Sequence, residues 1–481
     1  MIRSTMLRML RTVAWPAFVF GVLPGVASAQ SQDQRVVFIH GLFGNNLTWQ
    51  GTGNYLAQLY QIQPWYPNLG WTNTFETQAT NLQSALGSFN QFNAMAWSNG
   101  GVAERTYVQQ FGASTKLVRG FTVGTPHRGA LLVQNVRDGT AGRYASYVLN
   151  SIADPFNFYY AWDQDFHDAM DFGPNVIIRV TMELMAWVGY YFVPIINAVA
   201  VPASQSVPVG GEMIPSSSFM ATLNSPSRLS IEQANMPVRV SAGTSVSPQN
   251  AFFTLFSDEP QKWGAVRRLV EYYCFLLYDY YSAHPDFFLQ ANAWRWLQCA
   301  QSMEYFDVDW HFLIGSVQAI NNGIVYVDHQ DGLVPLGSQT WPGATVQENR
   351  LWPTYSIPHR RQITDPAILT LMQSVVNVRF GIPVRPPPLQ GSLSGPTAIE
   401  EYANGTWSAG ASGGYTPYSY QWYSDGYASG TGPSLTDGGW GGGTEHSIVV
   451  VVTDSRGGTS TRDLSVYVTY GGGCIYPPCP Q

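Results

Sequence analysis

The sequence is short of charge. Only 11% of its 481 residues are Asp, Glu, Lys or Arg, whereas the average soluble protein has roughly 25%. The net charge is -7, and no cluster of lysine or arginine beyond the N-terminus builds a basic face. Nucleic-acid binding depends on such a face. The composition therefore predicts that nucleic acid is not a partner.

Cysteine is also scarce, with four residues in the whole chain. No C-x-x-C pair or neighbouring set of histidines supports a zinc site. Four cysteines allow three disulfide pairings, and the local one is the simplest: Cys274 with Cys299, and Cys474 with Cys479. No cofactor is expected. Calcium is possible, but no motif indicates it.

Long uninterrupted apolar runs are missing as well. The apolar run at residues 13–26 follows three arginines, contains two prolines and is short for a membrane span of about 20 residues. It ends at Ala27-Ser28-Ala29, which is a small-x-small cleavage site. We predict a signal peptide over residues 1–29, cleaved before Gln30, with a membrane anchor as the alternative. The mature chain is then secreted or periplasmic, where disulfides form.

The mature chain begins with a buried strand that runs into glycines. Residues 35–39 form a β-branched and aromatic run, typical of a buried strand. His40-Gly41-Leu42-Phe43-Gly44 follows directly. Two glycines in such a loop leave backbone N–H groups free to face a ligand, as an oxyanion hole requires. A plain turn is the alternative.

A second motif places a serine between a strand and a helix. Residues 96–100 have the form small-x-Ser-x-Gly with Ser98 at the centre. This pattern suits a sharp strand-to-helix turn that exposes the serine, although an ordinary Ser/Gly turn fits it too. We expect a strand over 91–96, a helix over 100–111 and a strand over 116–123. Alternation of this kind predicts a parallel α/β sheet.

A third motif, Gly124-Thr125-Pro126-His127-Arg128-Gly129, follows the next strand. The three motifs in this order resemble the secreted bacterial lipases and esterases of the α/β-hydrolase fold. The resemblance implies an α/β-hydrolase domain over residues 30–380 with a mostly parallel sheet. The first two strands of the full fold are expected to be absent, as in the smaller lipases. Trp97 departs from the family pattern, where histidine is usual.

The resemblance also implies an acid and then a histidine further along the chain. Asp331 and His359 match the family's acidic and histidine loops, and the order Ser98, Asp331, His359 is the order of this fold. His359 is expected to take the serine proton, and Asp331 to orient the imidazole. The backbone N–H groups of Leu42 and Asn99 are expected to form the oxyanion hole.

Other polar residues are rivals for these roles. Asp307, Asp309 and His311 alternate, so on a strand they would share a face. They are a second-choice acid or a metal site, although solvated polar alternation explains them equally well. His40 is expected to shape the oxyanion loop. His127 is expected to be structural, because it falls between Ser98 and the acid.

Two insertions separate the motifs, at about residues 131–236 and 244–322. Both are rich in aromatic residues, as at 187–192 and 272–278. We expect large helical cap insertions that admit an apolar acyl chain and exclude water. An ordinary helical core is compatible with this. Residues 177–201 are broken by charges and a proline, so a lid helix is expected there and not a membrane span.

The C-terminal part changes in composition. A proline-rich linker is expected over residues 381–395. Residues 396–470 contain short β runs closed by turns and resemble an Ig-like β-sandwich of the polycystic-kidney-disease type. A cysteine-containing tail fills residues 471–481. The module is a passive spacer or contacts a surface or glycan, and its candidate contact residues are Trp407, Trp422 and Trp440.

Together these features predict a secreted, lipase-like serine hydrolase of carboxylic esters. It would cleave apolar acyl esters through an acyl-enzyme, with a lipid or other ester as substrate and transient contact with a lipid interface. An acyltransferase with the same three residues is one alternative. A non-catalytic surface-binding protein on a hydrolase scaffold is another.

Overall fold

The computed structural model describes residues 34–87, 89–162, 207–247, 251, 260–320, 323–326, 328–351, 354 and 356–471. The expected signal peptide, the stretch 177–201 and the Cys474–Cys479 pair lie outside these residues. The chain divides into two compact units, with the boundary between Arg385 and Pro386.

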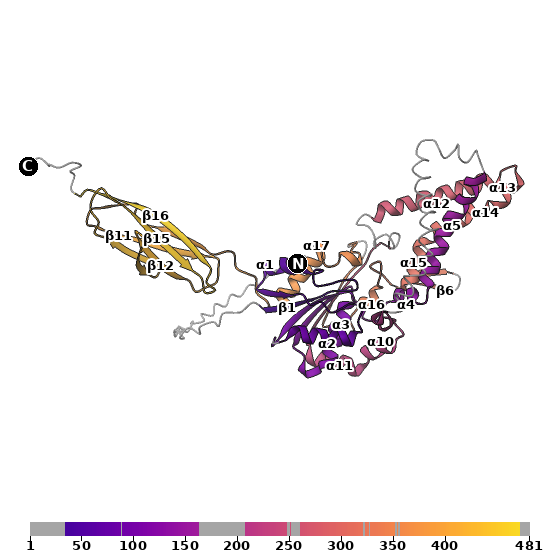
Figure 1. Cartoon of the computed structure of the whole chain (residues 1–481), viewed down its shortest axis with the longest axis horizontal. Helices are drawn as coiled ribbons and strands as arrows, with labels where there is room; N and C mark the ends of the chain where they lie inside the picture. The colour runs from indigo at the N-terminus through magenta and orange to yellow at the C-terminus, as the bar shows by residue number, and fades with distance from the viewer. Residues whose placement is uncertain are drawn as a thin grey trace, which may run out of the picture. The chain divides into compact units, whose positions relative to one another are not determined.

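The first unit is built on one parallel sheet. Its six strands are arranged in the order β2-β1-β3-β4-β5-β8, and every neighbouring pair is parallel. This sheet with its covering helices (Figure 1) confirms the predicted α/β-hydrolase fold. The strands are β1 (Gln34–Ile39), β2 (Ile62–Trp65), β3 (Phe92–Trp97), β4 (Leu117–Val123), β5 (Val238–Thr244) and β8 (Val346–Arg350).

Alternate side chains of each strand serve two separate cores. Val37 and Ile39 pack with helices α2 and α3, whereas Val36 and Phe38 pack with α1 and α17 on the opposite face. A parallel sheet covered on both faces in this way is fully buried, which explains its continuous apolar strands. The helices and turns around the sheet are α1 (Gln50–Leu59), α2 (Phe75–Leu86), α3 (Asn99–Phe111), η1 (Gly112–Ser114), α16 (Leu336–Gln339), η5 (His359–Arg361), α17 (Pro366–Ser374) and η6 (Val375–Arg379).

The strands and helices predicted around Ser98 are confirmed, but the segment Asp307–His311 is not a strand. It lies within helix α15 (Phe306–Ile314). Trp310, Leu313 and Ile314 recur at helical spacing and pack into a small core. Apolar residues at this spacing favour a helix over a strand. The polar residues therefore do not lie together on one face of a strand.

The described residues of the two insertions are mainly helical, as predicted. α12 packs against α14, and α14 against α5. Cys274 and Cys299 form the predicted disulfide between α12 and α14. The expected cover over Ser98 stays a prediction, because residues 163–206 and 252–259 lie outside the described part. The elements are α4 (Leu131–Arg137), α5 (Thr140–Trp162), α9 (Pro208–Glu212), α10 (Ser218–Leu223), α11 (Pro226–Asn235), α12 (Pro260–Ser282), α13 (Phe287–Asn292), α14 (Trp294–Glu304), β6 (Val317–Ile320) and β7 (Gly323–Tyr326).

None of the helices in the described ranges is long and apolar enough to cross a membrane.

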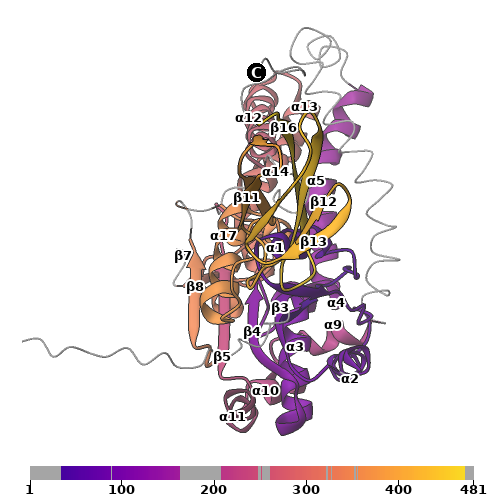
Figure 2. The same cartoon turned by 90° about the vertical axis from the view of Figure 1, so that its left-hand side faces the viewer.

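The second unit is an all-β domain of two sheets, drawn in yellow in Figure 2. Trp407 and Trp422 are fully buried in its core, so they cannot contact a glycan or a surface. Trp440 stacks on His446 with ring centroids 4.2 Å apart. One sheet has the order β10-β16-β15-β12-β13 and the other β14-β11-β9. The strands are β9 (Gln390–Ser394), within the expected linker, β10 (Ala398–Glu400), β11 (Asn404–Ser412), β12 (Ser419–Ser424), β13 (Tyr427–Thr431), β14 (Ser434–Gly438), β15 (Glu445–Thr453) and β16 (Thr459–Thr469).

Candidate active site

Ser98 occupies a strained turn between β3 and α3. Its backbone has φ 55° and ψ -135°, a conformation that residues other than glycine rarely adopt. Its N–H donates to the carbonyl of Val123 on the next strand, at 3.1 Å. Such strain persists only where the surrounding structure holds it, and it is common at functional sites. The turn therefore matches the predicted nucleophile turn.

The turn is packed against the loop expected to form the oxyanion hole, so closely that Gly41 and Gly100 are required. A Cβ on Gly100 would lie 2.5 Å from the carbonyl oxygen of His40, and one on Gly41 would lie 2.7 Å from Cβ of Ser98. The His40 Nδ1–H donates to the Gly41 carbonyl at 3.0 Å, and Nε2 accepts from Leu69 N–H at 3.2 Å. Burial lowers the pKa of His40, which favours the neutral ring that these two hydrogen bonds require.

The structure brings the three predicted catalytic residues together. His359 Nε2 lies 2.9 Å from Ser98 Oγ, and His359 Nδ1 lies 2.7 Å from Asp331 Oδ2. All three side chains are buried. A carboxylate beside Nδ1 fixes the tautomer that carries its hydrogen there. The lone pair of Nε2 then faces the serine hydroxyl, which is the arrangement needed for proton transfer.

Asp331 is held from several directions. Its Oδ1 accepts from the backbone N–H groups of Leu333, at 3.0 Å, and Val334, at 2.8 Å. Its Oδ2 accepts from His359 and from the side-chain amide of Gln362, the latter at 2.8 Å. A carboxylate that accepts four hydrogen bonds is held in one position. These contacts set the position of the imidazole relative to Ser98.

Gln362 and Trp97 belong to the site, although the sequence predicted a role for neither. The Trp97 indole Nε1 donates to Gln362 Oε1 at 3.0 Å and to the His359 carbonyl at 3.2 Å. The Gln362 amide also donates to Thr244 Oγ1 at 2.5 Å. The only signal in the sequence is that Trp97 stands where the family usually has histidine.

The two predicted oxyanion donors stand at the expected places in the chain. Leu42 follows Gly41 in the loop against Ser98, and Asn99 is the first residue of α3. N–H groups in the first turn of a helix have no partner within the helix, and the helix dipole favours negative charge there. Within the described part, both side-chain polar atoms of Asn99 are buried without a hydrogen-bond partner.

The remaining candidates lie outside this network. His127 is fully buried, its Nε2 lies 3.0 Å from Thr122 Oγ1, and its ring stacks on Trp341. Burial, with Arg105 nearby, lowers the pKa of His127 well below its usual range, so the ring is neutral and structural. His311 Nδ1 lies 2.6 Å from Ser316 Oγ. Over the described residues, no three potential ligands gather to hold a metal ion.

Comparison with known proteins gives only distant structural likenesses. No protein-family model and no curated protein matches the chain. Among solved structures, the mature form of the Bacillus licheniformis lipase BlEst2 is 12% identical, covers 73% of this chain and 96% of its own, and has a TM-score of 0.34. Its propeptide form covers 93% of this chain and 96% of its own at 11% identity, with a TM-score of 0.33.

A thermophilic esterase from Thermogutta terrifontis is 14% identical, covers 44% of this chain and 72% of its own, and has a TM-score of 0.23. At TM-scores this low, none of these likenesses supports a particular activity. The function must therefore be inferred from the strand order and from the geometry at Ser98.

Proposed function

We propose that the chain is a secreted serine hydrolase of carboxylic esters, lipase-like in its preference for apolar acyl groups. One observation carries the proposal: a continuous hydrogen-bonded chain runs from Ser98 Oγ through both ring nitrogens of His359 to Asp331. A serine hydroxyl is a poor nucleophile until a base removes its proton. His359 is placed to be that base.

The reaction has two steps. In the first, Ser98 Oγ attacks the ester carbonyl carbon while His359 Nε2 takes the hydroxyl proton. The Leu42 and Asn99 N–H groups stabilise the oxyanion. The intermediate collapses, His359 passes its proton to the departing alkoxide, and the acyl group remains on Ser98. In the second step, water attacks this ester with His359 again as the base, releasing the acid and restoring Ser98.

The choice of apolar esters is supported by exposed apolar side chains on the helical insertions. On α12, Leu269, Tyr272, Leu276 and Tyr280 are all exposed, and their spacing places them along one face of the helix. Phe287 on α13 is 82% exposed. Solvent-exposed apolar faces of this kind favour contact with a lipid or another apolar surface. Transient contact with a lipid interface is therefore part of the proposal.

Hydrolysis of p-nitrophenyl butyrate tests the proposal. Replacing Ser98 with Ala should lower kcat by at least about 10⁴-fold, while Ser84→Ala, at an exposed position on α2, should leave it unchanged. Product analysis with an added alcohol separates hydrolysis from acyl transfer. N-terminal sequencing of the exported protein tests secretion, for which the expected first residue is Gln30. Unchanged activity in Ser98→Ala would overturn the proposed mechanism.

A further inference from the structure

A pocket of about 570 Å³ opens on the face of the sheet covered by α2 and α3, away from Ser98. It is lined by residues of five helices, and none of them belongs to the catalytic network. Gln109 lies 11 residues after Ser98, which corresponds to about 16 Å along α3. The lining residues that matter here are Glu76, Gln109, Glu212, Phe219, Leu223 and Arg228.

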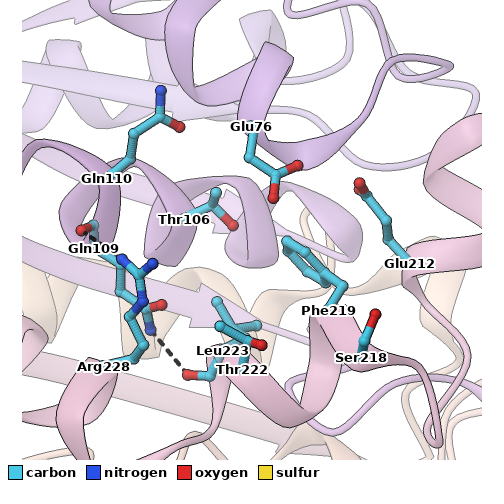
Figure 3. A pocket seen from close by; sticks show the side chains of 10 residues that line it. All are labelled: Glu76, Thr106, Gln109, Gln110, Glu212, Ser218, Phe219, Thr222, Leu223 and Arg228. Carbon is cyan, nitrogen blue, oxygen red and sulfur yellow. Dashed lines mark hydrogen bonds between the residues drawn. The ribbon is translucent and has the colours of Figure 1, made fainter.

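The charges in this pocket are unevenly placed. Figure 3 shows Glu76 and Glu212 close to each other on one side of Phe219, with Arg228 on the other side beside Gln109. The Arg228 guanidinium donates to the Gln109 carbonyl at 3.2 Å. The Arg228 guanidinium therefore does not directly neutralise the carboxylates of Glu76 and Glu212. One side of the pocket is acidic.

The floor of the pocket is apolar. Leu223 is buried, and the ring of Phe219 stacks on the buried ring of Phe75 with centroids 5.2 Å apart. This stacking fixes Phe219, so its ring presents a preformed surface. An aromatic face attracts a cation as well as an apolar chain.

Glu212 is held at the acidic side by a backbone contact. Its Oε2 accepts from the N–H of Phe75, the first residue of α2, at 2.7 Å. Burial, together with the neighbouring Glu76, raises the pKa of Glu212 to about 7. The pocket therefore holds two carboxylates that resist being ionised together. A positive charge between them would remove that conflict.

We propose that this pocket binds a small organic cation, with its ammonium group between Glu76 and Glu212 and its apolar body on Phe219 and Leu223. An organic cation satisfies both features of the pocket, because it brings a positive head to the acidic side and apolar surface to the floor. The volume of the pocket lies within the range of small-molecule sites, although most of its lining residues are polar. The proposal does not depend on the activity of Ser98.

Protonation gives the binding a defined pH dependence. The charged groups around Glu212 are Glu76 from α2, Arg228 from α11 and Arg137 from α4, whose guanidinium lies against α9 at Gly211; α3 and α10 line the pocket with uncharged residues. A bound cation favours the ionised form of Glu212. Affinity should therefore rise between pH 6 and pH 8, with release of up to one proton per cation bound.

Isothermal titration calorimetry of the full chain with hexylammonium chloride is the test. We expect saturable one-to-one binding at pH 8, with at least fivefold weaker binding at pH 6 and proton release seen as a difference between two buffers. The same titration with sodium hexanoate should show no binding. If titration with hexylammonium chloride gives no more heat than titration with potassium chloride at equal ionic strength, the proposal is wrong.

Matched variants locate the site. Glu212→Gln keeps an oxygen that can accept from Phe75 N–H, so the fold is retained. It should weaken binding roughly tenfold and remove the pH dependence. Glu445→Gln, the same change at an exposed position in the other unit, should bind like the native chain, and so should Ser98→Ala. Undiminished binding by Glu212→Gln would contradict the assignment.

Discussion

The indole Nε1 of Trp97 lies 3.0 Å from Oε1 of Gln362, a residue 265 positions further along the chain. An indole N–H can only donate, so the amide oxygen must face it and the amide NH₂ must face the other way. That NH₂ group donates to Asp331 Oδ2. Trp97, the residue before the proposed nucleophile, therefore sets the amide orientation that supports Asp331, the proposed catalytic acid.

This relationship makes Gln362 a positioning residue that can be tested. Gln362→Leu removes one charge-assisted hydrogen bond from the buried carboxylate, a contact that contributes about 1.5 to 3 kcal/mol. We expect kcat on p-nitrophenyl butyrate to fall about tenfold or more and KM to stay within about twofold. Trp97→Phe keeps the ring beside His359 but removes the donor, and should give a smaller loss. Native kcat in both variants would contradict this role.

The close approach of the proposed oxyanion loop, residues 40–44, to Ser98 gives a second prediction. Gly41→Ala places a methyl group 2.7 Å from Cβ of Ser98, so the loop or the serine must shift. A displacement of this kind typically costs about 10² in rate. We expect kcat/KM to fall by about that factor, and the crowding should lower the stability of the fold by about 1 to 3 kcal/mol.

Gly51→Ala is the matched control, because nothing lies within 4 Å of a Cβ at this position in α1. It should keep full activity and stabilise the helix by roughly 0.5 to 1 kcal/mol. Equal activity in Gly41→Ala and Gly51→Ala would show that the loop can shift without loss of activity, which would contradict this prediction.

The third prediction concerns a buried acid in α3. Glu104 is fully buried, and neither carboxylate oxygen has a hydrogen-bond partner in the described part of the chain. Burial and the charge of Glu232 raise the pKa of Glu104 well above its usual range, with Arg105 opposing them. The fold therefore favours the protonated form of Glu104.

The raised pKa of Glu104 determines how the stability of the fold changes with pH. Below pH 4.5, the ordinary pKa of a glutamic acid side chain, Glu104 is protonated in both the folded and the unfolded chain, so it costs no stability. Above this pH, the unfolded chain ionises first and stability falls by about 1.4 kcal/mol per pH unit until the folded pKa is reached. Glu104→Gln carries no such proton, so its advantage over the native chain should be near zero at pH 4 and should grow as the pH rises to 7. Thermal unfolding at both pH values measures it, and a constant difference would contradict the account.

The sequence allowed the site to be predicted where local motifs carry it. Ser98, Asp331 and His359 each lie in a short motif that resembles a motif of the bacterial lipases and esterases, and this resemblance joined them. Gln362 was missed because its contacts with Trp97 and Asp331 arise only from the folded chain. Nothing in a linear sequence marks an amide as the link between the two.

In the fold, too, elements with a clear local pattern were predicted and the others were missed. Strands β1, β3 and β4 are apolar runs and were predicted. The strands at the two edges, β2 and β8, were not, because β2 contains a proline and β8 is mostly polar. An edge strand has fewer apolar neighbours, so its sequence carries a weaker signal. In α15 the alternation of acidic residues suggested a strand, but buried apolar residues at helical spacing decided the outcome.

The fourth prediction concerns the disulfide between α12 and α14. Cys274 and Cys299 are 25 residues apart, and closing a loop of this length contributes about 3 kcal/mol in the chain-entropy model. Replacing both with Ser should lower the stability of the helical insertion. Proteolysis should then cut α12 or α14 sooner than in the native chain, while Ser98 still reacts with a small ester. Unchanged protease resistance would show that packing alone holds these helices.

Labelling with a fluorophosphonate, followed by peptide mass spectrometry, tests the central claim most directly. The mechanism predicts one label per chain, on Ser98, with no label in Ser98→Ala and at least about 10³-fold slower labelling in His359→Ala. A native chain that folds but stays unlabelled, or carries its label on another residue, would contradict the assignment of Ser98 as the nucleophile.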